Sequence, residues 1–316
     1  MLLVAYNQQH TIAQAIAGAL AQTWQPLEIV ISDDASTDAT FAAMQAAVAG
    51  YTGPHRIVLN RNPVNLGVGA HLSRCVALST GEMLFVAAGD DVSLPQRCER
   101  VMQAWIASGC ALDLIASGLV DIDQTGVAHE TITPADLSTY RHAADWLARP
   151  PYVVGAAQAW TRRLFDRFGP LPQGVVAEDL VMVLRAVMSG GAVTLAEPLV
   201  RYRRGGLSHR RRALHPQDVV NALLKNNRSS LVELTLLMAD AQTAGQLSLV
   251  ESALTARLAR EYFIRDLFIA DSLAARVRLL VGTPSVALST RIRVFVYAAC
   301  PSLLAPFFAL KRWSGR

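Results

Sequence analysis

Two pairs of adjacent aspartates, Asp33-Asp34 and Asp90-Asp91, each follow a short apolar run in the first hundred residues. Neighbouring carboxylates repel each other, so one of them tends to take up a proton unless a cation compensates the charge. Carboxylate oxygens suit Mg²⁺ or Mn²⁺, and a cation held there can also neutralise a diphosphate. The pair Asp90-Asp91 therefore indicates a divalent-cation site. The pair Asp33-Asp34 could accept hydrogen bonds from a base or a ribose hydroxyl.

Both pairs also have a purely structural interpretation. Aspartate caps helices well, and acidic residues near a helix N-terminus offset the helix dipole. Asp90-Asp91 could cap the predicted helix that has Pro95 in its first turn. Asp33-Asp34 likewise precedes another predicted helix. Each pair taken alone leaves both interpretations open.

The segments that must position these aspartates alternate between strand and helix patterns. Short apolar runs predict strands, and stretches with apolar residues three and four apart predict helices between them. This alternation predicts an α/β fold whose mostly parallel sheet is flanked by helices. Polar side chains at the strand ends then meet at one edge, where open sheets bind ligands. The predicted strands are residues 2–5, 27–31, 56–60, 83–87, 112–120, 192–196 and 199–203.

Other polar residues are expected near the same edge. Tyr6 follows the first predicted strand, and Asn65 and Gly67 precede a predicted helix whose N-terminus would attract anions. Glu178 and Asp179 open a later predicted helix. A carboxylate there could accept a proton from an attacking hydroxyl, although acids in a first turn also simply offset the dipole.

A dense basic stretch covers residues 201–212 and contains two glycines. Its arginines could close over a phosphate, whereas runs of charge are usually solvated faces. Arg203 and Arg204 are the candidates, and His209 is a weaker one. No nucleic-acid-binding motif accompanies the stretch, so we expect no nucleic acid partner.

The last third of the chain has a different character. Residues 1–200 carry 11 Lys/Arg against 18 Asp/Glu, whereas residues 201–316 carry 18 against 7. From about residue 215 the pattern predicts only helices, at 218–239, 248–268 and 273–280. The apolar segment 292–310 is interrupted by Arg293, Pro301 and Pro306. This favours a segment lying on a membrane surface, or packed on the domain, over a transmembrane span.

Composition limits the class of protein. Hydrophobic residues make up 52% and charged residues 17% of the 316 residues, which excludes a disordered chain. The four cysteines show neither a C-x-x-C pair nor the spacing of a zinc site, and no signal peptide is visible. We therefore expect a reducing, cytoplasmic environment.

Taken together, the motifs resemble the inverting GT-A glycosyltransferases of family 2. The resemblance covers about residues 1–210. It rests on Tyr6-Asn7, SDDASTDAT (32–40), NLGVGAHLSRCVALSTGEMLFVAAGDD (65–91), AEDLVMVLRAVMSGG (177–191) and YRRGGLS (202–208).

The resemblance implies a GT-A fold, which is Rossmann-like, with a helical C-terminal extension. Residues 1–214 would form the catalytic domain, with a nucleotide-binding half (1–100) and an acceptor half (101–214). Residues 215–316 would be the extension, and their basic charge together with the apolar run 292–310 suggests docking on the inner face of the plasma membrane. The implied reaction moves a sugar, with inversion, from a UDP- or dTDP-sugar to a lipid-linked or glycan acceptor in cell-surface glycan synthesis.

The resemblance also implies roles on the donor side. Asp91 would ligate Mn²⁺ or Mg²⁺, and Asp90 would meet the ribose or the metal's shell. Asp34 would bind the base with Asp33 beside it, and Tyr6 would border the ring. Asn65 and Gly67 would belong to the nucleotide-sugar site.

On the acceptor side, Asp179 would be the general base, with Glu178 supporting it. Arg203 or Arg204 would reach the diphosphate. Ala35 stands where the family has glycine, and the histidine expected in the last motif is absent, so Arg204 or His209 would have to replace it. This departure keeps open a second hypothesis, a nucleotide-sugar-binding assembly or regulatory subunit without catalysis.

Overall fold

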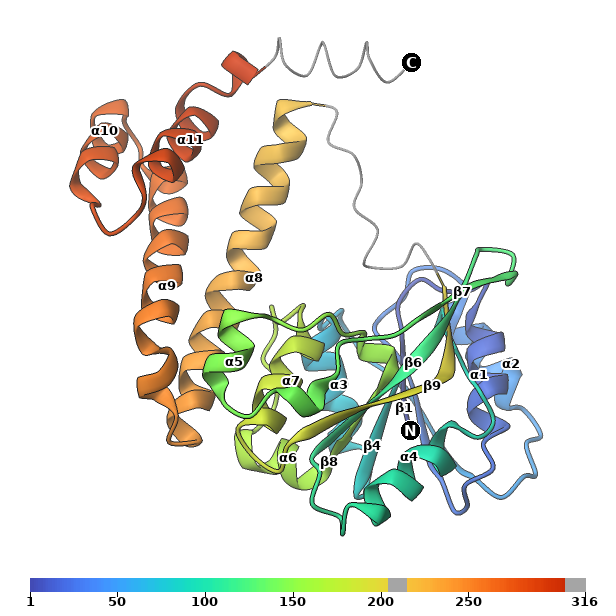
Figure 1. The fold of residues 1–316 in the computed structure, drawn as a ribbon. Coiled ribbons are helices and arrows are strands. Elements are labelled where there is room, and N and C mark those ends of the chain that lie inside the picture. Colours follow the sequence, from blue (N-terminus) through green and yellow to red (C-terminus); the bar gives the residue numbers. More distant parts are fainter. Residues whose placement is uncertain (204–214, 305–316) are drawn as a thin grey trace. The chain divides into compact units, whose positions relative to one another are not determined.

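The computed structural model describes residues 1–203 and 215–304 (Figure 1). The chain forms two compact units. The first contains Met1–His209 and Asp240–Gln246, and the second contains Arg210–Ala239 and Leu247–Arg316. The boundary expected at residue 214 stays a prediction.

A parallel four-stranded half of the sheet comes from the first ninety residues. Its strands are β1 (Leu2–Ala5), β2 (Glu28–Asp33), β3 (Arg56–Arg61) and β4 (Met83–Ala88), in the order β3-β2-β1-β4. All three pairings are parallel, with Leu3 level with Ile31 and with Ala87. The carboxyl ends of β1, β2 and β4 therefore share one edge, as the sequence predicts.

Beyond β4 the sheet becomes mixed. The order continues β4-β8-β6-β9-β5, and β7 pairs with β6. Strand β8 runs antiparallel to β4 and β6, whereas β6 and β9 are parallel. These strands are β5 (Val92–Ser93), β6 (Leu114–Ile122), β7 (Ala128–Ile132), β8 (Gln158–Thr161) and β9 (Ala192–Arg203).

Strand β9 corrects one expectation, because the two strands predicted at 192–196 and 199–203 are one. The pairing with β6 skips from Leu195 to Pro198, so an irregularity interrupts the ladder at the proline, which lacks an N–H to donate. The short strands β5, β7 and β8 were not predicted, because none of them contains a continuous apolar run like that of β1 (LLVA).

Helices cover both faces of the parallel half (Figure 1). Leu3, Ile29 and Phe85 alternate with Leu2, Val30 and Leu84 along their strands, and all six side chains are buried. The first three pack in one core cluster with residues of α1, α2 and α4. Helix α3 lies over the other face, where it contacts Ser32. The helices of this unit are α1 (Ile12–Leu20), α2 (Thr40–Val48), α3 (Val68–Ala77), α4 (Arg97–Ala107), α5 (Ala143–Ala148), α6 (Arg162–Phe168) and α7 (Glu178–Val187).

The second unit is helical, as the sequence predicts. It contains most of α8 (Pro216–Thr243), α9 (Leu247–Ile269), α10 (Leu273–Gly282) and α11 (Leu288–Ala299). Asn227 of α8 donates to Glu261 Oε2 of α9 at 2.8 Å, and Phe263, Leu267, Val286 and Val294 form the core. Within the described ranges, no helix is long and apolar enough to cross a membrane.

Candidate active site

The ends of β1, β2 and β4 are tied to one another by backbone hydrogen bonds. Asp34 N donates to Ala5 O at 2.9 Å, and Gly89 N donates to Val4 O at 2.9 Å. These bonds continue the parallel ladder by one residue on each side of β1. They bring the aspartates of β2 and β4 to the edge where Tyr6 is exposed. The convergence expected from the sequence is therefore a feature of the structure.

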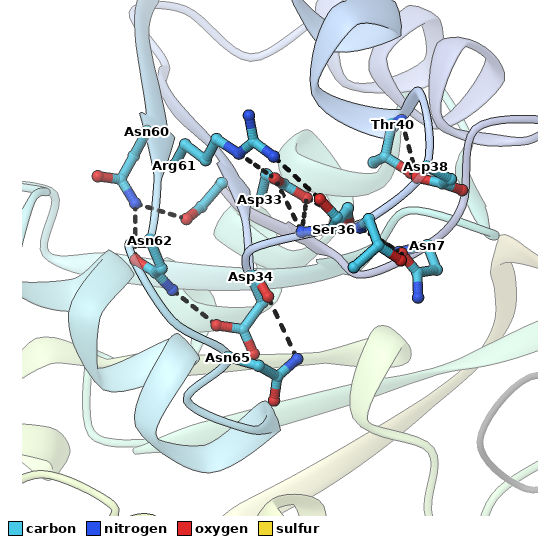
Figure 2. Close-up of polar contacts among 12 residues, drawn as sticks. Asn7, Asp33, Asp34, Ser36, Asp38, Thr40, Asn60, Arg61, Asn62 and Asn65 are labelled. Carbon is cyan, nitrogen blue, oxygen red and sulfur yellow. Dashed lines mark hydrogen bonds and ion pairs between the residues drawn. The ribbon is translucent and has the colours of Figure 1, made fainter.

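The loop after β1 is fastened to the loop after β2. Asn7 N donates to Ser36 Oγ at 2.8 Å, and Asn7 Oδ1 accepts from Thr37 N at 2.9 Å (Figure 2). Asn7 and Ala35 both adopt positive φ, of 53° and 59°. Asparagine tolerates this region well, whereas alanine does so with strain. Ala35 occupies the position where the resemblance expects glycine, which has no Cβ to clash.

Asp33 shapes this loop from inside the protein. Its carboxylate is fully buried and accepts from the backbone N–H and the hydroxyl of Ser36. Arg61 Nε lies 3.1 Å from Asp33 Oδ2 (Figure 2). The Arg61 guanidinium also stacks over the Phe41 ring, 5.2 Å from its centroid. These contacts are those of a loop-forming residue, and its place beside the base stays a prediction.

Asp34 fastens the loop that leads into α3. Its Oδ1 accepts from Asn62 Nδ2 at 2.8 Å and Leu66 N at 2.9 Å, and its Oδ2 accepts from Gly67 N at 2.9 Å. Asn65 Nδ2 donates to the Asp34 carbonyl at 3.2 Å (Figure 2). A carboxylate has about four lone-pair sites, so three bonds leave one for a ligand. Asn65 and Gly67 thus contact Asp34, and their place in a nucleotide-sugar site stays a prediction.

A network of hydrogen-bonded polar side chains holds Asn62, which in turn donates to Asp34. The sequence analysis did not predict this network. Asn60 Nδ2 donates to Asn62 Oδ1 at 3.0 Å and to Ser32 Oγ at 2.9 Å, and His71 Nε2 lies 2.7 Å from the same hydroxyl. Burial lowers the pKa of His71, although the charges of Asp34 and Asp33 oppose this shift. The available signal was the pair of asparagines at 60 and 62 directly after the apolar run 57–59.

Asp90 and Asp91 lie against the end of β9. Asp91 is buried, and its Oδ1 accepts from Arg203 N at 2.8 Å. Burial raises the pKa of Asp91 well above its usual range, and the neighbouring Asp90 raises it further. Burial also raises the pKa of Asp90. Two carboxylates that resist ionisation side by side are suited to a divalent cation, whose charge would compensate theirs.

The donor set fits a cation that keeps part of its hydration. Among residues 1–203 and 215–304, no three His, Cys, Asp or Glu side chains cluster as a closed metal site. Mg²⁺ is typically held by one or two carboxylates, with water and substrate phosphates in the other positions. Asp91, with Asp90 next to it, matches that pattern.

Arg203 is buried, and protein acceptors hold its guanidinium. Its Nε donates to Asp90 O at 3.0 Å, and Nη1 donates to Asp123 O at 2.8 Å and Gln124 O at 3.0 Å. Its Nη2 donates to Gln14 Oε1 at 2.8 Å. In this arrangement Arg203 fixes the Asp90 backbone, and a bond to a diphosphate would require exchange of these contacts. Arg204 and His209 lie outside the described residues.

Arg97 is a second buried arginine near the aspartates, and sequence reasoning missed it. Its Nη1 donates to Ser93 Oγ at 2.9 Å and its Nη2 to Gln158 O at 3.1 Å. Burial lowers its pKa to about 10, and the Asp91 charge opposes the shift. A signal existed in the sequence. Arg97 stands four and eight residues before Val101 and Trp105, so it lies on the buried stripe of α4.

Gln158 connects Arg97 with the start of α7, where Glu178 and Asp179 lie. Its Nε2 donates to Asp179 O at 3.3 Å, and its Oε1 accepts from Trp160 Nε1 at 2.9 Å. Glu178 lies over Gly155, where any Cβ would overlap Glu178 Oε1. Backbone and packing therefore fix the Glu-Asp pair in the same unit as the strand-end aspartates.

Comparison with known proteins defines the class. Residues 1–167 match the model of Glycosyl transferase family 2, which is more than half of the chain. The chain therefore belongs to glycosyltransferase family 2, and its α/β fold is confirmed as GT-A-like.

Two curated relatives illustrate the similarity. EpsE of Bacillus subtilis is 32% identical over 130 residues, which are 41% of this chain and 46% of EpsE. The succinoglycan biosynthesis protein ExoO of Rhizobium meliloti is 32% identical over 122 residues, 39% of this chain and 34% of ExoO. The matches thus span less than half the length of either relative.

Two solved structures share the fold. TarS 1–349 of S. aureus, in complex with UDP-GlcNAc, aligns with a TM-score of 0.54 at 16% identity, over 93% of this chain and 88% of that one. The mannosyltransferase PcManGT of Pyrobaculum calidifontis, in complex with GDP-Man and Mn²⁺, aligns with a TM-score of 0.53 at 18% identity, over 96% and 85%.

Proposed function

We propose that this protein is a metal-dependent inverting glycosyltransferase that uses a nucleotide-diphosphate sugar. The observation that carries the proposal is the meeting of Asp34 and Asp90-Asp91 at one sheet edge in a family 2 chain. The family relationship and the printed donor complexes of TarS and PcManGT support a nucleotide sugar as the donor. UDP- and dTDP-sugars are the donors to test first.

The donor nucleotide would bind across the ends of β1 and β2. Asp34 offers its remaining lone pair to a base N–H, and Tyr6, which is 46% exposed, offers a ring beside it. Asn65 and Gly67 stand at the start of α3, where the helix N-terminus favours the negative charge of the donor.

The diphosphate would lie at Asp91. Mg²⁺ or Mn²⁺ held by Asp91, with Asp90 beside it, would neutralise the charge that develops on the departing diphosphate. Arg203 keeps the Asp90 backbone in place, and Arg97 supplies a buried positive charge near Asp91. These arginines would preserve the geometry of the pair before the donor arrives.

Asp179 would accept the proton of the acceptor hydroxyl, with Glu178 supporting it. The freed oxygen would attack the anomeric carbon opposite the bond to the diphosphate, so the bond that forms has the inverted configuration. Asp179 Oδ1 accepts from Leu180 N at 2.8 Å, a hydrogen bond that orients the carboxylate.

The acceptor would be a glycan or a lipid-linked sugar that is a precursor of a cell-surface polysaccharide. The transfer itself would take place in the cytoplasm. The name of ExoO, a succinoglycan biosynthesis protein, supports a role in bacterial polysaccharide synthesis.

A donor screen with the full chain tests the function. Purified protein is incubated with UDP- and dTDP-sugars, Mn²⁺ and acceptor extracts, and nucleoside diphosphate release is measured. Asp179→Asn should abolish acceptor-dependent release while donor Kd, from calorimetry, stays within about twofold. Asp166→Asn removes an exposed carboxylate of α6 and should behave as wild type.

The alternative, a nucleotide-sugar-binding subunit without catalysis, is favoured by the missing histidine of the YRRGGLS segment. It predicts donor binding without release for every donor and acceptor tested. Absence of donor binding would overturn both functions.

A further inference from the structure

Exposed aliphatic side chains are concentrated near the end of the described chain. Of the fifteen large hydrophobic residues that are exposed within the described ranges, seven lie between residues 269 and 303. Scattered exposed hydrophobics are normal in any protein, but such a concentration marks an interaction surface. The seven are Ile269, Leu273, Val277, Val281, Leu288, Ile292 and Leu303.

Three of them form a stripe along α10. Leu273, Val277 and Val281 are four residues apart and are 63%, 43% and 73% exposed. At 100° per residue they fall within about 80° of the helix circumference. Leu279 points the other way, into the core cluster of this unit. The stripe is therefore a second apolar face, in addition to the one that holds α10 in the fold.

Helix α11 repeats the pattern. Leu288 and Ile292 are exposed four residues apart, whereas Val294 is buried in the core of the unit. In both helices an exposed arginine follows directly after an apolar residue of the face, Arg278 after Val277 and Arg293 after Ile292. Each helix thus presents aliphatic side chains with a cation at their border.

The other two arginines of these helices have structural partners. Arg276 Nη1 donates to Ala298 O at 2.9 Å, and Arg291 Nη1 donates to the Leu280 carbonyl. They join α10 to α11 and hold the pair together. Arg278 and Arg293 are thus left for an external partner.

The charge of this segment has one sign only. Residues 272–316 contain seven Lys/Arg and no Asp or Glu. Protein interfaces are enriched in aromatic anchors, whereas the exposed apolar residues of this face are all aliphatic and its charges are all positive. That combination is typical of helices that lie in the interface of a bilayer with anionic lipids.

We propose that α10 and α11 form a lipid-docking face, with anionic phospholipid headgroups as the ligand. Leu273, Val277, Val281, Leu288 and Ile292 enter the headgroup region, and Arg278 and Arg293 pair with lipid phosphates. This inference does not depend on the proposed glycosyl transfer. It assigns docking to an amphipathic helix pair, of which α11 shares residues 292–299 with the apolar segment 292–310 that the sequence singled out.

Vesicle co-sedimentation with the full chain tests the face. Vesicles contain phosphatidylcholine alone or with a third phosphatidylglycerol, and the partition coefficient is measured at low and high salt. Arg278→Gln/Arg293→Gln should lower partition to anionic vesicles about twenty-five-fold, since each arginine near such a surface contributes about fivefold. Val277→Ser/Ile292→Ser should lower it at least tenfold. The matched control, Ile106→Ser/Arg141→Gln, alters exposed residues of the first unit and should bind as wild type.

Circular dichroism and thermal melting check that each variant is folded. If Val277→Ser/Ile292→Ser fails to fold, the arginine double variant still tests the proposal, because it leaves the aliphatic residues in place. The proposal is overturned if wild type does not bind anionic vesicles, or binds them as strongly as neutral ones. It is also overturned if both double variants bind like wild type, which would assign docking to other residues. Dimers of wild type that Val277→Ser/Ile292→Ser dissociates, without vesicle binding, would identify the face as an interface between copies.

Discussion

Single residues at the edge of the parallel sheet have structural roles and, in the proposed function, ligand-binding roles as well. Asp34 holds the loop before α3 with three hydrogen bonds, and its fourth lone-pair site is the one that we propose for the donor. Asp33, its neighbour, uses its carboxylate within the protein. Alternation along β2 explains the difference, because successive side chains point to opposite faces. Asp34 is therefore the residue of this pair at which substitution should affect donor binding most.

Asp34→Asn should weaken donor binding and stability together. An amide nitrogen in place of one oxygen would face backbone N–H donors, leaving a buried donor unsatisfied at about 1–3 kcal/mol. We expect a donor Kd at least tenfold higher by calorimetry. Asn62→Ala removes one of the three bonds and leaves the carboxylate, so its Kd should rise less. Equal affinities of Asp34→Asn and wild type would contradict the role of Asp34.

Ala35 carries backbone strain at φ 59°. A left-handed conformation costs an L-residue about 1–2 kcal/mol in the folded state, and glycine avoids this cost. Glycine also raises the entropy of the unfolded chain, which lowers the free energy of unfolding by about 0.4–1 kcal/mol. Ala35→Gly should therefore stabilise the protein by up to about 1 kcal/mol in urea unfolding. Ala35→Val, with a branched Cβ, should destabilise it. A loss of stability in Ala35→Gly would refute the strain.

At the scale of elements, buried charged groups fasten the ends of strands and helices. Asp113, before β6, accepts from Thr161 Oγ1 at 2.7 Å, Arg163 Nε at 2.6 Å and Gly190 N at 2.7 Å. Arg185 of α7 contacts Asp240 of α8 through Nε at 2.7 Å and Nη2 at 3.2 Å. Both residues of that ion pair belong to the first unit. Each cluster joins segments that are distant in the sequence.

Asp113 should make stability depend on pH in the acid range. Burial alone would raise its pKa, but the hydrogen bonds from Thr161, Arg163 and Gly190 outweigh it and lower the pKa below 3.8. The stabilisation is then present above pH 3.8 and is lost as pH falls through the lower folded pKa. In urea unfolding, Asp113→Asn should be less stable than wild type at pH 6, and the difference should narrow below pH 4. A difference in stability between Asp113→Asn and wild type that does not change with pH would contradict a lowered pKa of Asp113.

Asp240→Asn should be strongly destabilising, because it leaves the Arg185 charge buried without its partner. Breaking a buried pair in this way costs about 3–5 kcal/mol, whereas replacing both partners by apolar residues is often nearly neutral. Arg185→Met/Asp240→Leu should therefore recover most of the loss in a double-mutant cycle of urea unfolding. Additive losses would show that the two residues act independently.

At the scale of the whole molecule, the proposed ligand site draws on residues of the first unit only, and the lipid-docking face on the second. The two activities can therefore be perturbed separately. Variants of Arg278 and Arg293 should leave donor binding unchanged, and variants of Asp91 should leave vesicle binding unchanged.

Cation and nucleotide should stabilise the protein together. A ligand at 100 times its Kd that binds only the native state adds about 2.7 kcal/mol. Mn²⁺ with UDP should therefore raise Tm by several degrees, and a chelator should abolish the increase. Asp91→Ala should remove the effect of Mn²⁺, whereas Asp166→Asn should retain it. An unchanged Mn²⁺ effect in Asp91→Ala would place the cation elsewhere.

The sequence by itself determined the alternation of strands and helices in the first ninety residues, the strand-end aspartates and the family, because local periodicity and motif spacing act over a few residues. It also predicted that Tyr6, Asp34 and Asp90 share one edge, since parallel strands align their ends. The tertiary structure decided which atoms each side chain contacts. Arg203 bonds to Asp90 across 113 residues, and Asp34 to Gly67 across 33. Such pairs depend on packing, as does the exposure of the α10 stripe, because hydrophobic spacing alone does not distinguish a face covered by the protein from one left for a partner.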